Sequence, residues 1–224
     1  MALRKEPIVK GEIYHIFNKT VGSEKIFVSK RLLDRAIETI KFYAFDNLDI
    51  RYSHYARLSS EDKNLFWDNT IENNTKRISI FTFSLMPNHF HFLAKEIKEK
   101  GISSFIGNFQ NSIAKFYNTR NKRPGALFQS GFKAVRIEND EQFVHVARYI
   151  HLNPLTSFLI KNPEDLKTYP GTSFPDYLGT RDLKIIDKEF LLKFFPSIEK
   201  MVEFTFNQVD YQRKLAKIKA LAIE

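Results

Sequence analysis

Apolar and polar positions alternate in several short segments of the chain, as they do in β-strands. Residues 12–18 (EIYHIFN), 78–86 (ISIFTFSLM) and 89–95 (HFHFLAK) are rich in β-branched and aromatic residues, which favour strands. The breaker residues at 86–88 separate the last two segments, so we expect these to be neighbouring antiparallel strands. Residues 132–138 (FKAVRIE) alternate in the same way and predict a fourth strand.

Three other segments carry apolar residues at helical spacing. Ser29 is a candidate N-cap for a helix of roughly four turns that runs to about Tyr43. Residues 102–118 predict a second helix, which is followed by the basic, turn-rich stretch NTRNKRPG. Asn139, with a glutamine three residues later, resembles a capping box and predicts a third helix that ends near the Asn-Pro pair at 153–154.

The elements follow one another in the order β-α-β-β-α-β-α. This order predicts an α+β domain of the ferredoxin-like type, in which an antiparallel sheet carries helices on one face. We assign this domain to residues 1–160. Within it, residues 48–75 are expected to form an excursion, with a strand over 50–58 and a helical segment around 60–72.

The pattern changes after residue 160, where several prolines and a glycine interrupt it. We therefore expect residues 161–224 to form an accessory and mostly helical extension. Lys188 to Phe195 predicts a short helix, and Val202 to Ala222 predicts a basic amphipathic one. Their role is not evident from the sequence.

Composition narrows the chemistry and suggests a partner. The chain has no cysteine, which excludes disulfides, cysteine nucleophiles and zinc held by cysteine. No apolar run is long enough to span a bilayer, and the first residues lack the apolar core of a secretory leader, so we expect a cytoplasmic protein without a membrane partner. The net charge of +9 suits a protein that meets a polyanion, although charge alone does not identify one.

His89 and His91 are the first candidates for chemistry. Side chains two residues apart on a strand point to the same face, so this pair can bind one metal ion while Phe90 and Phe92 enter the core. Two histidines that merely alternate on a surface strand would give the same pattern.

Tyr149 and Asn153 are the second candidates. They are four residues apart on the third predicted helix and therefore share a face. A tyrosine oxygen can attack phosphorus when a divalent cation offsets the phosphate charge, and an asparagine carbonyl suits a hard cation such as Mg²⁺ or Mn²⁺. The apolar neighbours of Tyr149 are equally compatible with a tyrosine that only packs in the core.

Several motifs in order resemble those of one protein family. The stretches LMPNHFHFL (85–93), ISSFIGNFQNSIAKFYN (102–118), GALFQSGFKAVRIENDEQ (125–142) and RYIHLNP (148–154) closely resemble tyrosine transposases of the insertion-sequence 200 type. Within that group they are most similar to the REP-associated tyrosine transposases. The resemblance runs from about Tyr14 to Leu159, with weaker similarity beyond.

The resemblance implies a site and a reaction. In the HUH superfamily, to which these transposases belong, two histidines flanking a bulky apolar residue bind the metal ion, and His89 and His91 match them. Tyr149 matches the single nucleophile, and Asn153 matches a polar residue that can complete the metal site. The implied activity is cleavage and joining of single-stranded DNA, beside hairpins, through a 5′-phosphotyrosine.

Other readings of the same residues remain open. Tyr117 is a competing nucleophile, and His15, His54, His145 and His151 match no ligand position of the family. The chain could also be a catalytically retired DNA-binding regulator, or a replication initiator of the same superfamily that nicks an origin. The sequence does not choose between a monomer and a homodimer.

Several side chains are candidates for contacts with DNA. They are the cations of the turn-rich stretch and of the strand that follows, which suit phosphates, and one phenylalanine that could stack on a base. These residues are Arg120, Lys122, Arg123, Phe128, Lys133 and Arg136. Family members often have Gly-Arg-Phe-Lys where this chain has Ser-Gly-Phe-Lys at 130–133, so one basic contact is expected to be missing.

Overall fold

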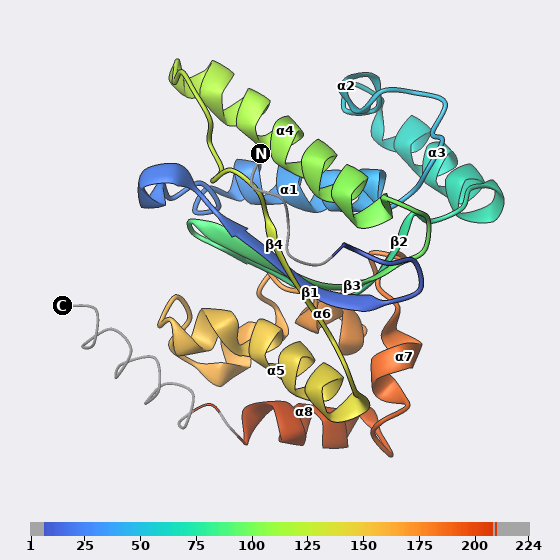
Figure 1. The fold of residues 1–224 in the computed structure, drawn as a ribbon, viewed down its shortest axis with the longest axis vertical. Helices are drawn as coiled ribbons and strands as arrows, with labels where there is room; N and C mark the ends of the chain where they lie inside the picture. The colour runs from blue at the N-terminus through green and yellow to red at the C-terminus, as the bar shows by residue number, and fades with distance from the viewer. Residues whose placement is uncertain (1–6, 208, 210–224) are drawn as a thin grey trace.

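Four strands form a single antiparallel sheet in the computed structural model, which describes residues 7–207 and Val209 (Figure 1). The order of the strands in the sheet is β2-β3-β1-β4. The strands are β1 (Ile13–Lys19), β2 (Ile78–Met86), β3 (His89–Glu96) and β4 (Lys133–Arg136). All three strand pairs are antiparallel, which confirms the α+β class predicted from the order of the elements.

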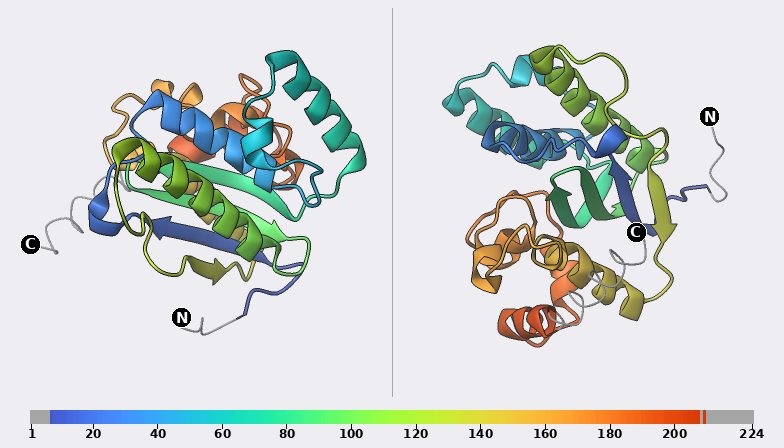
Figure 2. Two further views of the ribbon diagram at one scale, coloured as in Figure 1. Left: turned by 90° about the horizontal axis from the view of Figure 1, so that it is seen from above. Right: turned by 90° about the vertical axis from the view of Figure 1, so that its left-hand side faces the viewer.

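Helices cover both faces of this sheet. Helices α1 (Lys30–Tyr43) and α4 (Gly101–Asn121) lie on one face, and α5 (Asp140–Thr156) lies on the other (Figures 1 and 2). The expectation of helices on one face is therefore correct for α1 and α4 and wrong for α5. All nine residues of β2 are buried, and such a continuous apolar strand needs a covering layer on each side.

The core on the α4 side is built from phenylalanine rings of β3 and α4. The ring of Phe92 lies 5.2 Å from that of Phe105 and 5.6 Å from that of Phe109, in edge-to-face geometry. Phe90 meets Phe109 in the same way at 5.3 Å. Such contacts add stability beyond the area that they bury, so β3 is firmly held from this side.

The regular structure of the excursion is helical. It contains α2 (Tyr52–Tyr55) and α3 (Ser60–Asn73), so the expected helical segment is confirmed and the expected strand over 50–58 is wrong. Tyr52 and Tyr55 are three residues apart and both pack against the ring of Phe42, which requires helical spacing. This long-range aromatic contact outweighs the local preference of tyrosine for strands.

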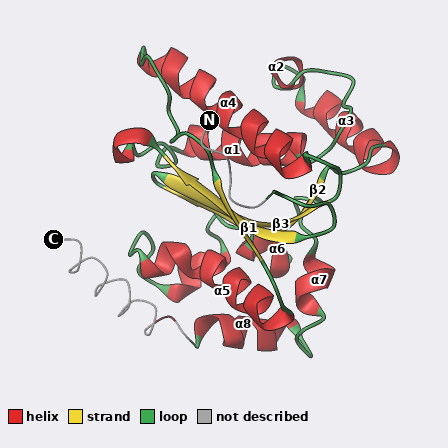
Figure 3. Cartoon of the chain, in the orientation of Figure 1, coloured by secondary structure: helices red, strands yellow, loops and turns green. Residues whose placement is uncertain are grey.

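In its described part the extension consists of short helices joined by turns and loops (Figure 3). After a 3₁₀ turn at Pro163–Lys167 it contains α6 (Phe174–Tyr177), α7 (Lys188–Leu192) and α8 (Ile198–Phe206). The short helix expected from Lys188 is α7. The basic helix expected over Val202 to Ala222 overlaps α8 at residues 202–206, although α8 begins earlier, at Ile198. Beyond Val209 the expected helix lies outside the described residues. None of the described helices is long and apolar enough to cross a membrane.

The extension completes the edge of the sheet beside β2. The backbone N–H of Leu85 donates to Gly171 at 2.7 Å, and the N–H of Asp187 donates to Ile80 at 2.8 Å. The Tyr177 hydroxyl donates to the carbonyl of Phe81 at 2.9 Å. These bonds satisfy backbone groups that an open sheet edge would leave exposed.

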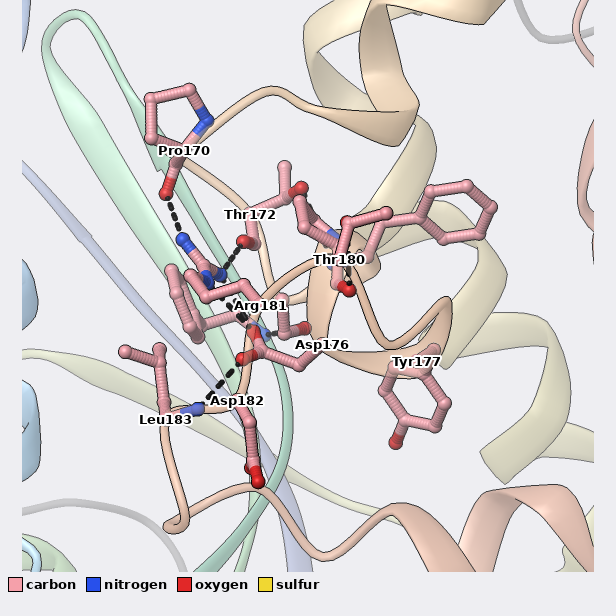
Figure 4. Close-up of polar contacts among 12 residues, drawn as sticks. Pro170, Thr172, Asp176, Tyr177, Thr180, Arg181, Asp182 and Leu183 are labelled. Atoms are coloured by element: carbon pink, nitrogen blue, oxygen red, sulfur yellow. Dashed lines mark hydrogen bonds and ion pairs between the residues drawn. The ribbon is translucent and has the colours of Figure 1, made fainter.

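A buried ion pair fixes the loop that makes these contacts. The Arg181 guanidinium lies 2.6 Å from the Asp176 carboxylate, which is 1% exposed, and donates to the carbonyls of Pro170 and Thr172 (Figure 4). The other carboxylate oxygen of Asp176 accepts from the N–H of Leu183 at 2.9 Å. With these hydrogen bonds in place the buried charges are compensated.

The packing of the extension predicts that it unfolds together with the sheet. Phe174→Ala removes a fully buried ring and should lower the free energy of unfolding by about 3–5 kcal/mol. The measurement is urea unfolding followed by fluorescence of Trp67, the single tryptophan, which lies in α3 on the far side of the sheet. Ile198→Ala, at a position 41% exposed in α8, should change stability by no more than about 0.5 kcal/mol. A Trp67 transition that is unmoved by Phe174→Ala would mean that the extension folds separately.

Candidate active site

The alternation of β3 separates its histidines from its phenylalanines. In the register with β1, His91 lies opposite Phe17 and His89 lies opposite Lys19. Because opposed residues of paired strands share a face, these four side chains lie on the α5 side. Phe90 and Phe92 point to the α4 side, as the sequence predicted.

Helix α5 brings Tyr149 against the histidines. The Tyr149 ring meets His91 edge-on at 5.7 Å between ring centroids, and the rings of His89 and His91 are 5.1 Å apart. Tyr149 is 40% exposed, so its side chain contacts His91 and is still accessible to solvent. Asn153, one turn along α5, is buried, and its Nδ2 atom has no hydrogen-bond partner. The four residues proposed as the catalytic set are thus neighbours in space.

The Nδ1 atoms of both β3 histidines are occupied by neighbouring side chains. His89 Nδ1 lies 2.7 Å from Asn88 Oδ1, and His91 Nδ1 lies 2.9 Å from His15 Nε2. Because the amide oxygen only accepts, His89 carries its proton on Nδ1, which leaves a lone pair on Nε2. His91 has the same arrangement when it donates to His15. Outer partners of this kind orient histidines for binding a metal ion through Nε2.

The surroundings of the three histidines favour their neutral forms. Burial holds the pKa of His91 well below its usual range, and the neighbouring His15 and His89 lower it further. Burial lowers the pKa of His15 to about 4. Burial, together with the charge of Lys19, also lowers the pKa of His89. Neutral imidazoles keep the lone pair that a cation requires.

His15 was not among the residues predicted for the site. It lies on β1 diagonally across from His91 and on the same face, and its ring is 6.0 Å from that of Tyr149. The sequence did contain an indication, because His15 alternates with Phe17 and Lys19 in a predicted strand. His15 comes close to His91 only because β1 pairs with β3, and the sequence does not show this pairing.

Tyr149 is a protonated phenol in this environment. Burial raises its pKa, and the nearby Asn153 side chain opposes that rise. A phenol must lose its proton to act as a nucleophile, so it needs positive charge nearby when it reacts.

Tyr117, the competing tyrosine, belongs to α4 on the opposite face of the sheet, and its hydroxyl donates a hydrogen bond to Glu24.

A metal ion bound by His89 and His91 would need a third ligand that is neither a histidine nor a carboxylate. Within residues 7–207 and Val209, no group of three or more His, Asp or Glu side chains is arranged to hold a metal ion. The two β3 histidines therefore need a third ligand of another kind. Asn153 lies one turn along α5 from Tyr149, and its amide oxygen is the kind of ligand that a hard cation accepts.

Lys19 and Lys133 lie on the same face of the sheet as the histidine pair. Lys133 on β4 lies opposite Phe17, and its ammonium is 5.9 Å from the Phe17 ring centroid. Lys19 lies opposite His89 and is exposed. Lys133 was predicted as a contact for DNA, whereas Lys19 was not.

The other predicted DNA contacts lie in different environments. Arg120 and Lys122 are exposed at the end of α4. Arg123 is occupied within its loop, where its guanidinium donates to the carbonyl of Ala126 at 3.0 Å. Arg136 pairs with Glu12 at 3.0 Å.

Phe128, the predicted stacking residue, is a core side chain. It is 7% exposed, and its ring meets that of Phe90 edge-on at 5.7 Å. Its ring offers no open face for a base.

Helix α5 is held in place by a hydrogen-bonded chain that involves His151. His151 Nε2 lies 3.0 Å from the hydroxyl oxygen of Ser173, which accepts from the backbone N–H of Phe83 at 3.0 Å. This chain links α5, the extension and β2. The helix also continues two residues beyond Pro154, to Thr156. Tyr149 and Asn153 therefore lie on a helix that is fixed at its C-terminal half.

Part of the chain matches a known family model. Residues 56–153 match the model of the family described as IS200-like transposases, which confirms the resemblance seen in the sequence. This match contains His89, His91, Tyr149 and Asn153. No curated protein matches the chain.

Solved structures similar to the chain include two transposases. The first is a REP-associated tyrosine transposase bound to a REP hairpin, with 15% identity and a TM-score of 0.52, covering 82% of this chain and 90% of that one. At this identity the likeness supports the fold. The second is a putative transposase from Deinococcus radiodurans R1, with 12% identity and a TM-score of 0.36, covering 66% of this chain and 95% of that one.

The burial of His151 predicts a dependence of stability on pH. Burial lowers the pKa of His151 to about 3 from the usual 6.5, so below pH 6.5 the unfolded chain binds a proton that the folded chain does not. This contribution to stability is complete above pH 6.5 and is lost as the pH falls towards 3, by up to about 1.4 kcal/mol per pH unit.

His151→Gln can keep the bond to Ser173 but cannot titrate, so its free energy of unfolding should fall less steeply than that of the wild type. Urea unfolding at a series of pH values measures the two slopes. His54→Gln, which removes an exposed histidine, is the matched control and should retain the wild-type slope. Equal slopes for wild type and His151→Gln would contradict the burial of a neutral imidazole.

Proposed function

We propose that this chain cleaves and rejoins single-stranded DNA through a 5′-phosphotyrosine on Tyr149, because residues 56–153 match the model of the IS200-like transposases. The observation that carries the proposal is the packing of the Tyr149 ring against His91, with His89 on the same face. A core tyrosine would be enclosed, but Tyr149 is 40% exposed. A nucleophile needs both the access and the neighbouring imidazoles.

A divalent cation, Mg²⁺ or Mn²⁺, belongs to this proposal. His89 and His91 would hold it through their Nε2 atoms and Asn153 through its amide oxygen. When bound, it offsets the negative charge of the phosphate that is attacked.

The proposed reaction is a transesterification at phosphorus. The Tyr149 oxygen attacks the phosphorus and loses its proton. The bond between phosphorus and the 3′ oxygen of the preceding nucleotide breaks, and that oxygen leaves as a 3′-hydroxyl. Attack of another 3′-hydroxyl on the phosphotyrosine restores the phenol and joins the strands. The number of phosphodiester-type bonds is unchanged in each step, so no external source of energy is needed.

Residues around the pair would position the DNA. Lys19 and Lys133 share the face of the histidines and would contact backbone phosphates. The relative with known structure was bound to a REP hairpin, and we extend this to the present chain as a preference for single strands next to a hairpin.

The proposed nucleophile can be tested by trapping the covalent adduct. Purified protein with Mn²⁺ should form an adduct with hairpin-flanked single-stranded DNA that survives denaturing electrophoresis. Tyr149→Phe should abolish the adduct because it lacks the attacking oxygen, while Tyr117→Phe should retain it. The labelled half of the DNA in the adduct identifies the 5′ linkage.

The same assay separates the alternatives. A retired regulator would bind DNA with no adduct, and with no response to EDTA or to Tyr149→Phe. An adduct that forms only on an origin-like strand, with no rejoining to a second 3′-hydroxyl, would indicate an initiator. Loss of the adduct in Tyr117→Phe would contradict the assignment of Tyr149 as the nucleophile.

The metal site can be tested without turnover. Binding of Mn²⁺, measured by the electron paramagnetic resonance of the free ion, should be lost in His91→Ala. Loss of the hydrogen bond to His91 in His15→Ala should weaken binding by roughly 10–100-fold, as for other outer partners of histidine ligands. His54→Ala, at an exposed histidine on α2, should bind Mn²⁺ like the wild type. Unchanged binding in His91→Ala would refute the site.

A further inference from the structure

A cavity of about 530 Å³ opens on the face of the molecule opposite Tyr149. It lies between α1 and α4 and is bordered by the segment that leads into α2. The sheet separates this cavity from α5 (Figures 1 and 2). The volume is within the range of pockets that enclose a whole small ligand, and it is not part of the candidate active site.

Positive charge dominates the lining. Arg35, Arg51, Arg77 and Lys115 face one acid, Asp46. Asp46 is already compensated twice, by Arg77 at 3.1 Å and by Lys98 at 2.8 Å. Within the described part of the chain, Arg35, Arg51 and Lys115 make no ion pair. The cavity therefore favours an anion.

Arg35 is fixed in a way that suits a planar ligand. Its guanidinium lies between two rings, 4.9 Å from the centroid of Tyr52 and 4.4 Å from that of Phe116. Its Nη2 atom is 3.4 Å from the Ser112 hydroxyl, while its buried Nε has no hydrogen-bond partner. A guanidinium that lines the cavity, makes no ion pair within the described residues and is held against two rings is prepared to bind a phosphate.

The rest of the lining offers groups that suit a base. Tyr43 contributes an aromatic ring, and its hydroxyl is held by the Ser112 side chain. Asn108 and Asn111, exposed on α4, contribute amides that can both donate to and accept from the edge of a base. Phosphate-binding cations beside an aromatic ring and amides are the combination used to bind unpaired nucleotides.

We propose that this cavity between α1 and α4 binds a nucleoside phosphate, most simply one unpaired nucleotide of a DNA strand. The proposal rests on the proposed function only in taking DNA as the partner. It adds a second contact for DNA on the face away from the nucleophile. A strand that reaches both faces would have to pass around the sheet, and such a contact would select DNA by an unpaired nucleotide remote from the cleaved bond.

The test measures binding alone, in the Tyr149→Phe background with EDTA, so that cleavage cannot contribute. The probe is a fluorescein-labelled 20-nucleotide single strand of mixed sequence, followed by anisotropy. Arg51→Gln/Lys115→Gln removes two exposed cations of the cavity, and Lys10→Gln/Arg57→Gln removes two exposed cations outside it. The cavity variant should weaken binding at least tenfold more than the control variant. Its plot of log affinity against log salt should be shallower by about 1.4, which corresponds to two lost phosphate contacts.

Titration calorimetry with deoxynucleoside monophosphates distinguishes a free nucleotide from a nucleotide of a DNA strand as the ligand. Binding of a monophosphate that is lost in the cavity variant assigns the cavity to free nucleotides, and binding of the oligonucleotide alone assigns it to a strand. Arg51→Lys/Lys115→Arg should restore affinity if charge is the cause. Equal losses in the cavity and control variants would overturn the proposal, as would a poly-glutamate peptide that competes as well as the oligonucleotide. If DNA binding depends on the cavity residues but the wild-type protein forms no phosphotyrosine adduct, the catalytic proposal is refuted and the cavity proposal stands.

Discussion

The period of two along β3 is the constraint on which the structure of this protein depends. One strand carries Phe90 and Phe92 into the packed core under α4 and presents His89 and His91 to the other face. The same rings that stabilise the sheet therefore fix the orientation of the histidines. A shift of one residue in register would bury the imidazoles in an apolar layer and move the phenylalanines out of the core. The register of β3 therefore determines both the core and the site.

The second layer of helices gives the site its other half. Tyr149 reaches the histidines because α5 is pressed against the sheet, and α5 is held by the chain from His151 through Ser173 to β2. The extension is thus more than an addition to the domain. Its buried pair of Asp176 and Arg181 shapes the loop that carries Ser173, which in turn supports the helix of Tyr149.

The two faces of the sheet have different electrostatic characters. The α5 side holds three neutral histidines and a protonated phenol, with lysines nearby, which suits a site that acquires positive charge from a cation and negative charge from a phosphate. The α4 side holds a cavity with permanent positive charge. Chemistry and binding can therefore be separated in space, because the sheet insulates one set of groups from the other.

The sequence by itself determined the order of strands and helices, the pairing of His89 with His91, and the sharing of one helix face by Tyr149 and Asn153. These properties are local, since they follow from periods of two and 3.6 residues. Only the tertiary structure decided that α5 covers the second face of the sheet, that the segment at Tyr52 is helical, that Phe128 is core, and that His15 touches His91. Each of these depends on contacts between residues far apart in the chain, where long-range packing energy outweighs local preference.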